Sequence, residues 1–597
     1  MKRFHTRALG LAALLTALAA CSGGGGGGGG GTTCNNTCPS IGKTQCSGAL
    51  VQTCAADSSG CLAWSAAASC GAARTCSSVS NACVADLCQG VPTNGVCASS
   101  TTVQFCGAPT GDATLHVLSY ECSPGQQCQI QNGKASCVLI AACVDGQTQC
   151  GGASTLQTCT GGLWQSSNCT GACLNTALGG VCGSAAPTTT FSGRVLFEYR
   201  APNAGLTDWA SAPSLSASPA ILVVSGNANG TIYDAVYTDL ASATMGQFTI
   251  KVPASPTVDD ALLVVAAADD GAGKLAFAIA DPNFAISGIQ AVGPTAVGTS
   301  PRAWSWRWPL SGLTNGQDLT ITEAMGAGAA NVHFNMVRAY VDTFLQFGHA
   351  GPPVVIWLGY GTSWSCGSCF APWPTNQFGV PFAGQMFLGG DSNQQFWADP
   401  VTSHELGHWT MAFYGTSPNE GGPHMLSIPT FPGQAWSEGW ATWFSSDVRA
   451  DPIYYDKQAG SFFWMSIADR TYSAGVTWHR PSPTSPDGLL QLMDENEVSA
   501  MLWKLSSLSA NADAALFSAL ASPRMNTGPF KRGYTRHVWD VAGPGNFVNV
   551  VTTGDSVPMV ADFLDALECA GVSRTVIDNA TQPTTFYPFP SAAPICQ

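Results

Sequence analysis

Apolar residues follow two different spacings along the chain, and the spacing changes near residue 320. From residue 190 to about residue 312 they alternate with polar residues, which is the period of a β-strand with one buried face. Beyond residue 320 they recur every four residues up to Gly348, which predicts a helix that ends at this glycine. The positions that carry the two patterns are Phe248, Ile250 and Val252, then Val332, Met336, Tyr340 and Phe344.

Two short apolar runs, residues 353–358 and 385–388, predict strands that follow this helix. Asp399 and Pro400 then mark the start of a second helix, with the aspartate as N-cap and the proline at the first helical position. Residues 320–597 therefore predict an α+β domain.

The β-rich part carries a resemblance to a known domain type. Val236-Tyr-Thr-Asp239, followed by Gly246-Gln-Phe-Thr-Ile-Lys-Val-Pro253, resembles the β-sandwich of carboxypeptidase-regulatory-like domains. This implies a sandwich over residues 190–312. Such domains pack, space or bind, so we expect no chemistry from it.

The amino-acid composition limits the kinds of partner that this chain can bind. The chain of 597 residues is too long for one hydrophobic core, only 10% of its residues are charged, and its formal net charge is −14. A chain with this acidic balance does not favour phosphates, which argues against nucleic acid or an anionic membrane surface as a partner. We expect a multidomain extracellular protein.

The first 33 residues have the pattern of an export signal followed by a tether. Residues 1–21 begin with basic side chains and continue with an apolar run that is too short to span a bilayer as a mature helix. The run ends in Leu18-Ala-Ala-Cys21, which resembles the lipobox of bacterial lipoproteins and implies lipidation of Cys21. A glycine-rich tether, residues 22–33, favours this interpretation over an ordinary secretory signal. We expect a lipid anchor, and no other membrane contact, at the extracellular or periplasmic face of a bacterial cell envelope.

Residues 34–183 hold 20 of the 25 cysteines, a density typical of disulfide frameworks in exported proteins. The cysteines form three copies of six, with periods of 51 and 53 residues measured at Cys46, Cys97 and Cys150. Cys34 and Cys61 remain as an extra pair. The spacing leaves the pairing within each copy open. A stalk and a recognition module are both compatible with these repeats, whereas zinc binding is disfavoured because they lack C-x2-C pairs.

Two cysteine pairs lie outside the repeats. Cys366 and Cys369 form a C-x2-C pair, for which we expect a local disulfide in an oxidising compartment. A redox-active dithiol and half of a metal site are the alternatives. Cys569 and Cys596 are expected to tie down the C-terminal tail.

The chemistry concentrates in His404-Glu-Leu-Gly-His408, on the helix predicted from Asp399. His404 and His408 are four residues apart, so on a helix they share one face and can bind one metal ion. Glu405 lies about 100° around that helix, toward the place of a water molecule beside the metal. Three fixed positions arise by chance in a long chain, so this motif alone is not decisive.

A second motif, Ala435-Trp-Ser-Glu-Gly-Trp-Ala-Thr-Trp-Phe444, follows downstream. Together the two motifs resemble the gluzincin metallopeptidases, in which a glutamate on a downstream helix is the third zinc ligand. The resemblance covers roughly residues 325–570, and it implies that Zn2+ is bound by His404, His408 and Glu438. His424 is the alternative third ligand. The resemblance also implies that residues 385–388 are the edge strand that pairs with an extended substrate.

The chain departs from the gluzincin pattern in the residue that orients a ligand histidine. Family members place a carboxylate four or seven residues after the third ligand, and Thr442 and Ser445 occupy those positions here. Glu497, near the start of another predicted helix, is our candidate for this role. The alternative is that Glu497 and its acidic neighbours only complement the helix dipole.

The residue that stabilises the oxyanion is the second departure, because no motif identifies it. We rank Tyr455 and His479 first, since each lies beside a second polar side chain. The other candidates by position are Tyr454, Tyr472 and His537.

The resemblance implies hydrolysis of a peptide bond by a zinc-activated water, with Glu405 as general base. We expect a surface-anchored zinc metallopeptidase that acts on proteins or peptides. An endopeptidase is favoured over an aminopeptidase, because no motif for gripping a free α-amine is present. The overall expectation is disulfide-rich repeats, then a β-sandwich, then an α+β zincin-like domain. The alternatives are an inactive adhesion lipoprotein with a metallopeptidase fold and a structural protein whose repeats carry the function.

Overall fold

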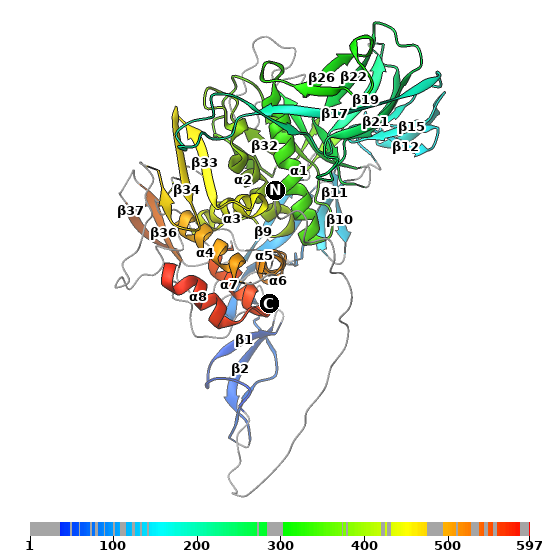
Figure 1. Cartoon of the computed structure of the whole chain (residues 1–597). Helices are drawn as coiled ribbons and strands as arrows, with labels where there is room; N and C mark the ends of the chain where they lie inside the picture. The colour runs from blue at the N-terminus through cyan, green and yellow to red at the C-terminus, as the bar shows by residue number, and fades with distance from the viewer. Residues whose placement is uncertain are drawn as a thin grey trace, which may run out of the picture. The chain divides into compact units, whose positions relative to one another are not determined.

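The computed structural model describes residues 36–596, apart from short loops and the longer segments 108–114, 283–301, 419–423, 427–431, 474–493, 527–535, 542–546, 553–557 and 586–595. The chain divides into two compact units, residues 1–140 and 141–597. It is multidomain, with strands and disulfides in the N-terminal region and helices in the C-terminal region (Figure 1). This confirms the expected order of parts at that level. None of the described helices is long and apolar enough to cross a membrane.

The first unit is built from short strands. One sheet joins β1 (Thr44–Ser47), β2 (Leu50–Ala56), β3 (Leu62–Trp64) and β4 (Ala68–Ser69). A second has the order β5-β6-β9-β8-β7, and β10 and β11 form a hairpin. Their bounds are Arg74–Ser77 for β5, Ala82–Leu87 for β6, Val96–Cys97 for β7, Thr102–Gly107 for β8, Leu115–Glu121 for β9, Gln126–Gln131 for β10 and Lys134–Leu139 for β11.

The first and third cysteine repeats share one disulfide connectivity, which the spacing had left open. In the first and third copies the first cysteine bonds the third, the second bonds the fifth, and the fourth bonds the sixth. The middle copy has the first two of these bonds, and its fourth cysteine, Cys122, lies outside the described residues, as does Cys34. The bonds are Cys38–Cys54, Cys46–Cys76, Cys70–Cys83, Cys88–Cys106, Cys97–Cys128, Cys143–Cys159, Cys150–Cys173 and Cys169–Cys182. Such a density of disulfides indicates an oxidising, extracellular environment.

The third repeat belongs to the second unit and continues into the sandwich. The Ser184 amide donates to the carbonyl of Ile232 at 2.6 Å, and the Ala177 amide donates to the Tyr237 hydroxyl at 2.5 Å. The repeat is therefore fixed to the sandwich by hydrogen bonds. Its strands are β12 (Thr148–Gly152), β13 (Thr155–Thr160), β14 (Leu163–Asn168), β15 (Cys173–Thr176) and β16 (Gly179–Cys182).

Two sheets, β18-β17-β21 with β27 beside β17, and β20-β19-β22-β26, bury alternate residues in one shared core. Val195 and Phe197 of β17 and Leu262 and Val264 of β22 are all fully buried there. The strand period of the sequence therefore identified the buried faces correctly. The bounds are β17 (Thr188–Tyr199), β18 (Ser214–Ala217), β19 (Leu222–Asn227), β20 (Ile232–Tyr237), β21 (Gln247–Pro253), β22 (Asp260–Val265), β26 (Ser305–Pro309) and β27 (Asp318–Ile321).

The expected boundary between residues 190–312 and 320–597 does not hold for three strands. β23 (Ala267–Asp269) and β24 (Leu275–Asp281) belong to the sheet of the C-terminal part, because β24 pairs in parallel with β28 (Val354–Leu358). β22 leads almost directly into β23, so a short stretch of chain passes from one sheet to the other. β25 (Arg302–Ala303) pairs with β24 as well.

The edge strand of this sheet is also not the expected one. Residues 385–388 lie in β32 (Gly384–Leu388), which is flanked by β28 on one side and by β29 (Cys369–Ala371) on the other. The sheet order β23-β24-β28-β32-β29 therefore ends at β29, which runs antiparallel to β32. The expected Cys366–Cys369 disulfide is present and closes the loop immediately before β29.

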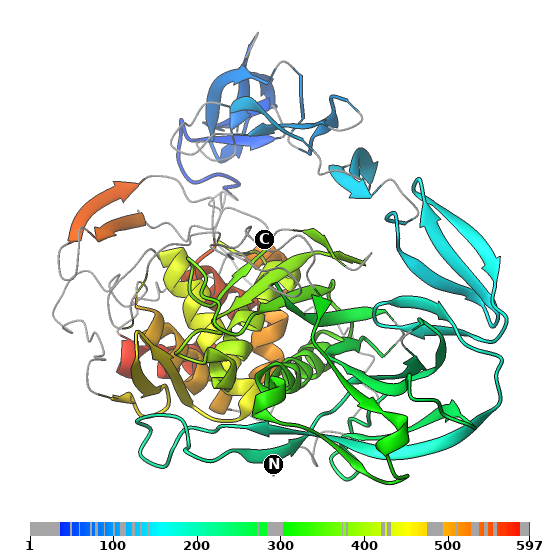
Figure 2. The same ribbon diagram turned by 90° about the horizontal axis from the view of Figure 1, so that it is seen from above.

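The helices gather in one cluster, coloured green to red (Figures 1 and 2). The predicted helix before Gly348 is α1, and Gly348 ends it in the left-handed conformation with φ 71°. The helices are α1 (Ala327–Phe347), α2 (Asp399–Tyr414), α3 (Pro432–Arg449), α4 (Glu495–Ser507), α5 (Ala512–Leu520), α6 (Pro523–Asn526), α7 (Val560–Cys569) and α8 (Arg574–Thr585). The remaining strands are β30 (Thr375–Gln377), β31 (Val380–Phe382), β33 (Ile453–Gln458), β34 (Ser461–Ser466), β35 (Thr471–Tyr472), β36 (Arg536–Val541) and β37 (Phe547–Thr552).

The start of α2 is fixed by α1 rather than by a cap of its own. Asp399 is the first helical residue and not the N-cap, a position that Ala398 occupies. The Asp399 carboxylate accepts hydrogen bonds from Asn335 at 2.7 Å and Asn331 at 3.2 Å, both on α1. These bonds make Asp399 a tether between the two helices.

Glycine lets α2, α3 and α4 cross closely. A Cβ atom at Gly407 of α2 would lie 2.7 Å from the Ala441 Cα of α3. A Cβ atom at Gly439 of α3 would lie 2.5 Å from the Val498 side chain and 3.0 Å from the Glu495 carbonyl of α4. The distances to Ala441 and Val498 are too short for a real contact, so each crossing requires a residue without a side chain.

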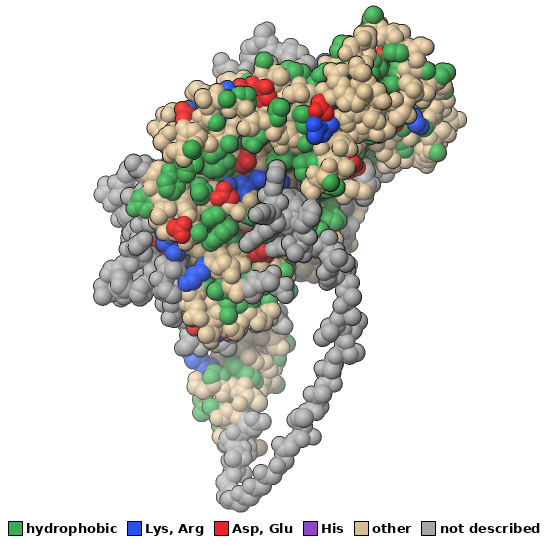
Figure 3. Space-filling view, in the orientation of Figure 1, with side chains coloured by type: hydrophobic (Ala, Val, Ile, Leu, Met, Phe, Trp, Pro, Cys, Tyr) green, Lys and Arg blue, Asp and Glu red, His purple; other side chains and the backbone are tan. Residues whose placement is uncertain are grey.

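Charged side chains are sparse on the face drawn in Figure 3. Lys and Arg (blue) and Asp and Glu (red) are scattered there among uncharged residues, without a broad patch of either sign on the described surface of that face. This fits a chain in which only 10% of residues are charged.

Gly407→Ala should destabilise the second unit. The new Cβ meets the backbone of α3, which cannot rotate away, so we expect a loss of about 1–3 kcal/mol in the free energy of unfolding. Thermal and urea unfolding would measure it. Gly312→Ala is the matched control, because a Cβ there meets nothing within 4 Å. Equal stability of both variants and the wild type would contradict the close crossing.

Candidate metal centre

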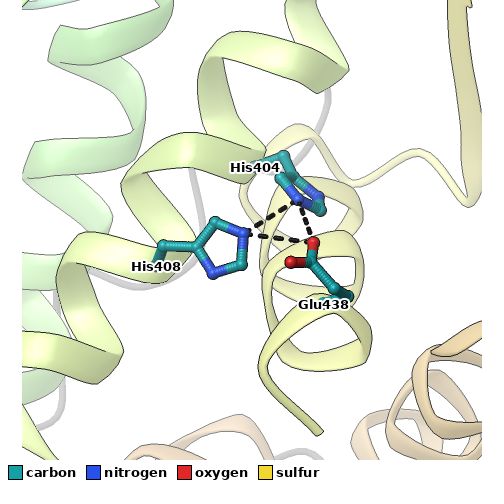
Figure 4. A group of neighbouring side chains, drawn as sticks. All are labelled: His404, His408 and Glu438. Atoms are coloured by element: carbon teal, nitrogen blue, oxygen red, sulfur yellow. Dashed lines mark hydrogen bonds and ion pairs between the residues drawn. The ribbon is translucent and has the colours of Figure 1, made fainter. Parts of the chain in front are cut away.

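Three ligand-type side chains from two helices converge on one point. His404 and His408 project from α2 and Glu438 from α3 (Figure 4). The Nε2 atoms of His404 and His408 lie 3.0 and 3.2 Å from Oε2 of Glu438 and 3.1 Å from each other. Two ligands of one tetrahedral zinc ion lie about 3.3 Å apart when the bonds are about 2.0–2.1 Å long. These three residues can therefore hold a metal ion.

The far side of each imidazole is fixed by a hydroxyl group. Nδ1 of His404 lies 3.2 Å from the Thr442 hydroxyl, and Nδ1 of His408 lies 3.0 Å from the Ser437 hydroxyl. An Nδ1–H that donates to a hydroxyl oxygen leaves the lone pair of Nε2 free for a metal. The donor set and its orientation thus fit a cation bound at Nε2.

Thr442 is one of the two positions at which the gluzincin pattern has a carboxylate and this chain does not. It lies four residues after Glu438, on the same face of α3, and its hydroxyl takes over the orienting contact. Glu497 does not provide that contact. It is buried and forms an ion pair with Arg470 at 3.3 Å. Helical spacing from Glu438 was the signal that could have identified Thr442.

Glu405 is a buried carboxylate beside this group. Glu405 is 4% exposed, and its Oε2 atom has no hydrogen-bond partner among the described residues. Burial raises the pKa of Glu405, and the nearby His404 and His408 only partly offset this. A buried carboxylate oxygen without a partner is costly in a protein interior, so its presence here indicates a polar or cationic occupant of the site.

The charges of the ligand group are complementary. Burial would lower the pKa of His408, but the negative charge of Glu438 and the contact with it outweigh burial and raise this pKa. Burial would raise the pKa of Glu438, but His424, His408 and His404 hold it well below its ordinary value. Glu438 is therefore an anion at neutral pH, as a metal-binding carboxylate must be.

His424 lies next to the same glutamate, on its other oxygen. Its Nε2 atom is 3.6 Å from Oε1 of Glu438, and its Nδ1 atom is 2.8 Å from Oε2 of Glu495. Glu495 is the first residue of α4 and is 3% exposed. His424, Glu438 and Glu495 form a second group whose ligand atoms lie close enough together to hold a metal ion. The sequence had marked His424 as the alternative third ligand, but it gave no reason to join Glu495 to it.

Strand alternation separates the two adjacent tyrosines of β33. The Tyr454 ring lies 5.9 Å from the His404 ring. Burial dominates the rise in the pKa of Tyr454, and the charges of Asp456, Glu405, Glu438 and Glu495 add to it. Tyr455 points the other way, with its ring 6.2 Å from the ring of Trp209 and from that of Phe462. The structure thus brings Tyr454, and not Tyr455, to the candidate metal centre.

The other candidate residues are dispersed. His479 and Cys21 lie outside the described residues. Tyr472 is 39% exposed on β35, and His537 lies on β36. The expected Cys569–Cys596 disulfide is present and ties the C-terminal tail to the end of α7.

Comparison with known proteins does not assign the chain to a family, because no family model and no curated protein matches it. The interpretation of the centre therefore depends on the geometry and chemistry of its own residues.

Thr442→Val should weaken metal binding without removing a ligand. Valine keeps the shape but leaves Nδ1 of His404 without its acceptor, and contacts of this kind are worth about 10–100-fold in metal affinity. Competition with a chelator of known zinc affinity measures the change. Thr442→Ser, which restores the hydroxyl, should bind within a few-fold of wild type. Equal affinity of the valine variant would show that the hydroxyl does not orient His404.

Proposed function

We propose that this protein is an extracellular zinc-dependent peptidase that hydrolyses peptide bonds at the centre formed by α2 and α3. The observation that carries the proposal is the meeting of two Nε2 atoms and one carboxylate oxygen within 3.2 Å, beside Glu405, whose Oε2 atom has no hydrogen-bond partner among the described residues. Two histidines and one carboxylate are a ligand set found in catalytic zinc sites, which keep a fourth position open.

His404, His408 and Glu438 would hold the ion. When bound, zinc supplies Lewis acidity, which lowers the pKa of water at the site to near 7 and polarises a carbonyl group. Thr442 and Ser437 keep the two imidazoles in the tautomer and orientation that this requires.

Glu405 acts as the general base. Its pKa is raised by burial, which brings the carboxylate closer to the pKa of the group that it deprotonates. It takes the proton of a water molecule during attack on the peptide carbonyl and delivers that proton to the leaving amine. This transfer returns Glu405 to its ionised form at the end of each cycle.

Tyr454 supplies the donor for the carbonyl oxygen. Burial and four nearby carboxylates raise the pKa of Tyr454 and keep its phenol protonated at neutral pH, so it donates a hydrogen bond to the negative charge that develops on that oxygen. This assignment replaces Tyr455, which packs on the opposite side of β33.

The disulfides and the N-terminal motif support a site of action outside the cytoplasm. The disulfide bonds of the cysteine repeats favour an oxidising compartment. The Leu18-Ala-Ala-Cys21 motif supports a lipid anchor at a bacterial cell envelope. Protein or peptide substrates would therefore be met outside the cytoplasm.

Glu405→Gln should keep the metal and lose activity. The amide cannot accept the proton, so we expect casein cleavage by residues 34–597 to fall by about 10²–10⁴-fold, while bound zinc stays at the wild-type value. His404→Ala should lose both the bound zinc and the cleavage activity. Zinc content by mass spectrometry and cleavage by a fluorescent casein assay measure the two quantities. Full cleavage by Glu405→Gln would remove Glu405 from the reaction, and a zinc-free wild type would remove the proposal itself.

Tyr454→Phe should lower kcat by about 10²–10³-fold with little change in KM, because only the donor to the developing negative charge is lost. Tyr455→Phe is the matched control and should retain the wild-type kcat, since its ring contacts Trp209 and Phe462 instead. Steady-state kinetics on one peptide substrate compares them. A loss confined to Tyr455→Phe would reverse the assignment.

A further inference from the structure

We propose that the Cys366–Cys369 disulfide is a redox switch that controls the position of β33, the strand that carries Tyr454. While the bond is closed, a hydrogen-bond network of Ser368, Gln395 and Asp456 holds this strand in place. Reduction of the bond by a dithiol frees the outer end of the network and lowers the peptidase activity. This inference rests on the proposed function, because it takes Tyr454 as the donor to the carbonyl oxygen.

The network joins three segments that are distant in the sequence. The Ser368 hydroxyl donates to Oε1 of Gln395 at 2.8 Å, and Nε2 of Gln395 donates to Oδ2 of Asp456 at 2.8 Å. A carboxylate only accepts hydrogen bonds, so the NH2 group of Gln395 must face Asp456 and its oxygen must face Ser368. Gln395 opens the short 3-10 helix Gln395–Trp397 that leads into α2. The network therefore connects the disulfide loop, the start of the metal-binding helix and β33.

The inner end of the network lies beside the groups that carry the reaction. Asp456 is two residues after Tyr454, so both side chains face the same side of β33. After burial, the charge of Asp456 makes the largest contribution to the raised pKa of Tyr454. Burial raises the pKa of Asp456 to about 7, and the charge of Glu405 adds to this rise. A displacement of Asp456 would therefore move Tyr454 and alter the surroundings of Glu405.

The outer end of the network lies within the ring that the disulfide closes. The bond joins two cysteines three residues apart, and Gly367 between them turns the chain with φ 74°. β29 begins at Cys369 and is a three-residue strand at the end of its sheet, so it restrains this segment little. A disulfide restricts the conformations of the residues that it encloses. Without it, the hydrogen bonds of Ser368 to Gln395 and from the Gly389 amide would compete with water.

This bond is accessible to a reductant. Among the cysteines whose exposure the structure describes, Cys366, Cys569 and Cys596 are exposed, whereas those of the repeats are buried or half-buried. A thiolate of the dithiol attacks Sγ of Cys366, which forms a mixed disulfide and releases Cys369 as a thiolate that takes up a proton. The second thiol of the reductant then attacks the mixed disulfide and releases Cys366. The dithiol is oxidised to a disulfide, and the protein gains two thiols.

The test replaces both Cys366 and Cys369 by serine in the full chain, which opens this bond and leaves the other disulfides intact. We expect kcat on one peptide substrate to fall by about 10–100-fold, with KM and bound zinc unchanged, because the donor is misplaced. Amide hydrogen exchange in β33 should become about tenfold faster. Cys569→Ser with Cys596→Ser, which opens another exposed disulfide, is the matched control and should keep the wild-type kcat and exchange.

Two further measurements separate the steps of the switch. Ser368→Ala keeps the disulfide and breaks the network, so it should lower kcat and speed up exchange in β33 as well. It keeps the test valid if the double serine variant folds poorly. Dithiothreitol should lower the kcat of the wild type to that of the double serine variant, reoxidation should restore it, and the double serine variant should not respond.

The outcomes distinguish this inference from the proposed function. Wild-type kcat and exchange in the double serine variant and in Ser368→Ala would overturn the switch. An equal response of the wild type and the double serine variant to dithiothreitol would place the redox effect at another disulfide and also overturn it. A zinc-loaded wild type that cleaves no peptide would overturn the proposed function. Exchange in β33 would still show whether the disulfide holds the strand: faster exchange supports that control, and unchanged exchange overturns it.

Discussion

The close crossing of α2 and α3 is the constraint on which the candidate metal centre depends. A side chain at Gly407 would meet the backbone of Ala441, so the two helix axes can approach only because this position is glycine. That approach brings Glu438 within 3.2 Å of two imidazoles, a distance that a metal ion can span but that a wider crossing would lose. Gly407 therefore acts through helix packing: it lets α3 come close enough for Glu438 to reach His404 and His408.

Burial gives the centre its electrostatic character. Glu405 and Glu438 share one buried region, yet the pKa of Glu405 is raised while that of Glu438 is lowered. The difference arises because three histidines surround Glu438, whereas burial dominates at Glu405. Two chemically identical side chains therefore become suited to different tasks, one to accept a proton and the other to remain an anion.

The parts of the second unit are interleaved rather than joined end to end. β22 leads into β23 and thus from the sandwich into the sheet that contains β28 and β32. Trp209, in a loop after β17, reaches β33 and contacts Tyr455, the neighbour of the tyrosine beside His404. The sandwich therefore supports the strand that carries Tyr454, which gives it a structural connection to the metal centre without a side chain in it.

The spacing of residues along the chain was enough to predict much of the local structure of this protein. Helical spacing was enough to place His404 and His408 on one face, and alternation identified the buried sides of the strands, because both depend only on backbone geometry. The tertiary structure decided what depends on the packing of distant segments: the disulfide connectivity, the edge at β29, and the approach of Glu495 to His424. It also decided between Tyr454 and Tyr455, since alternation requires them to face opposite ways but does not say which one faces α2.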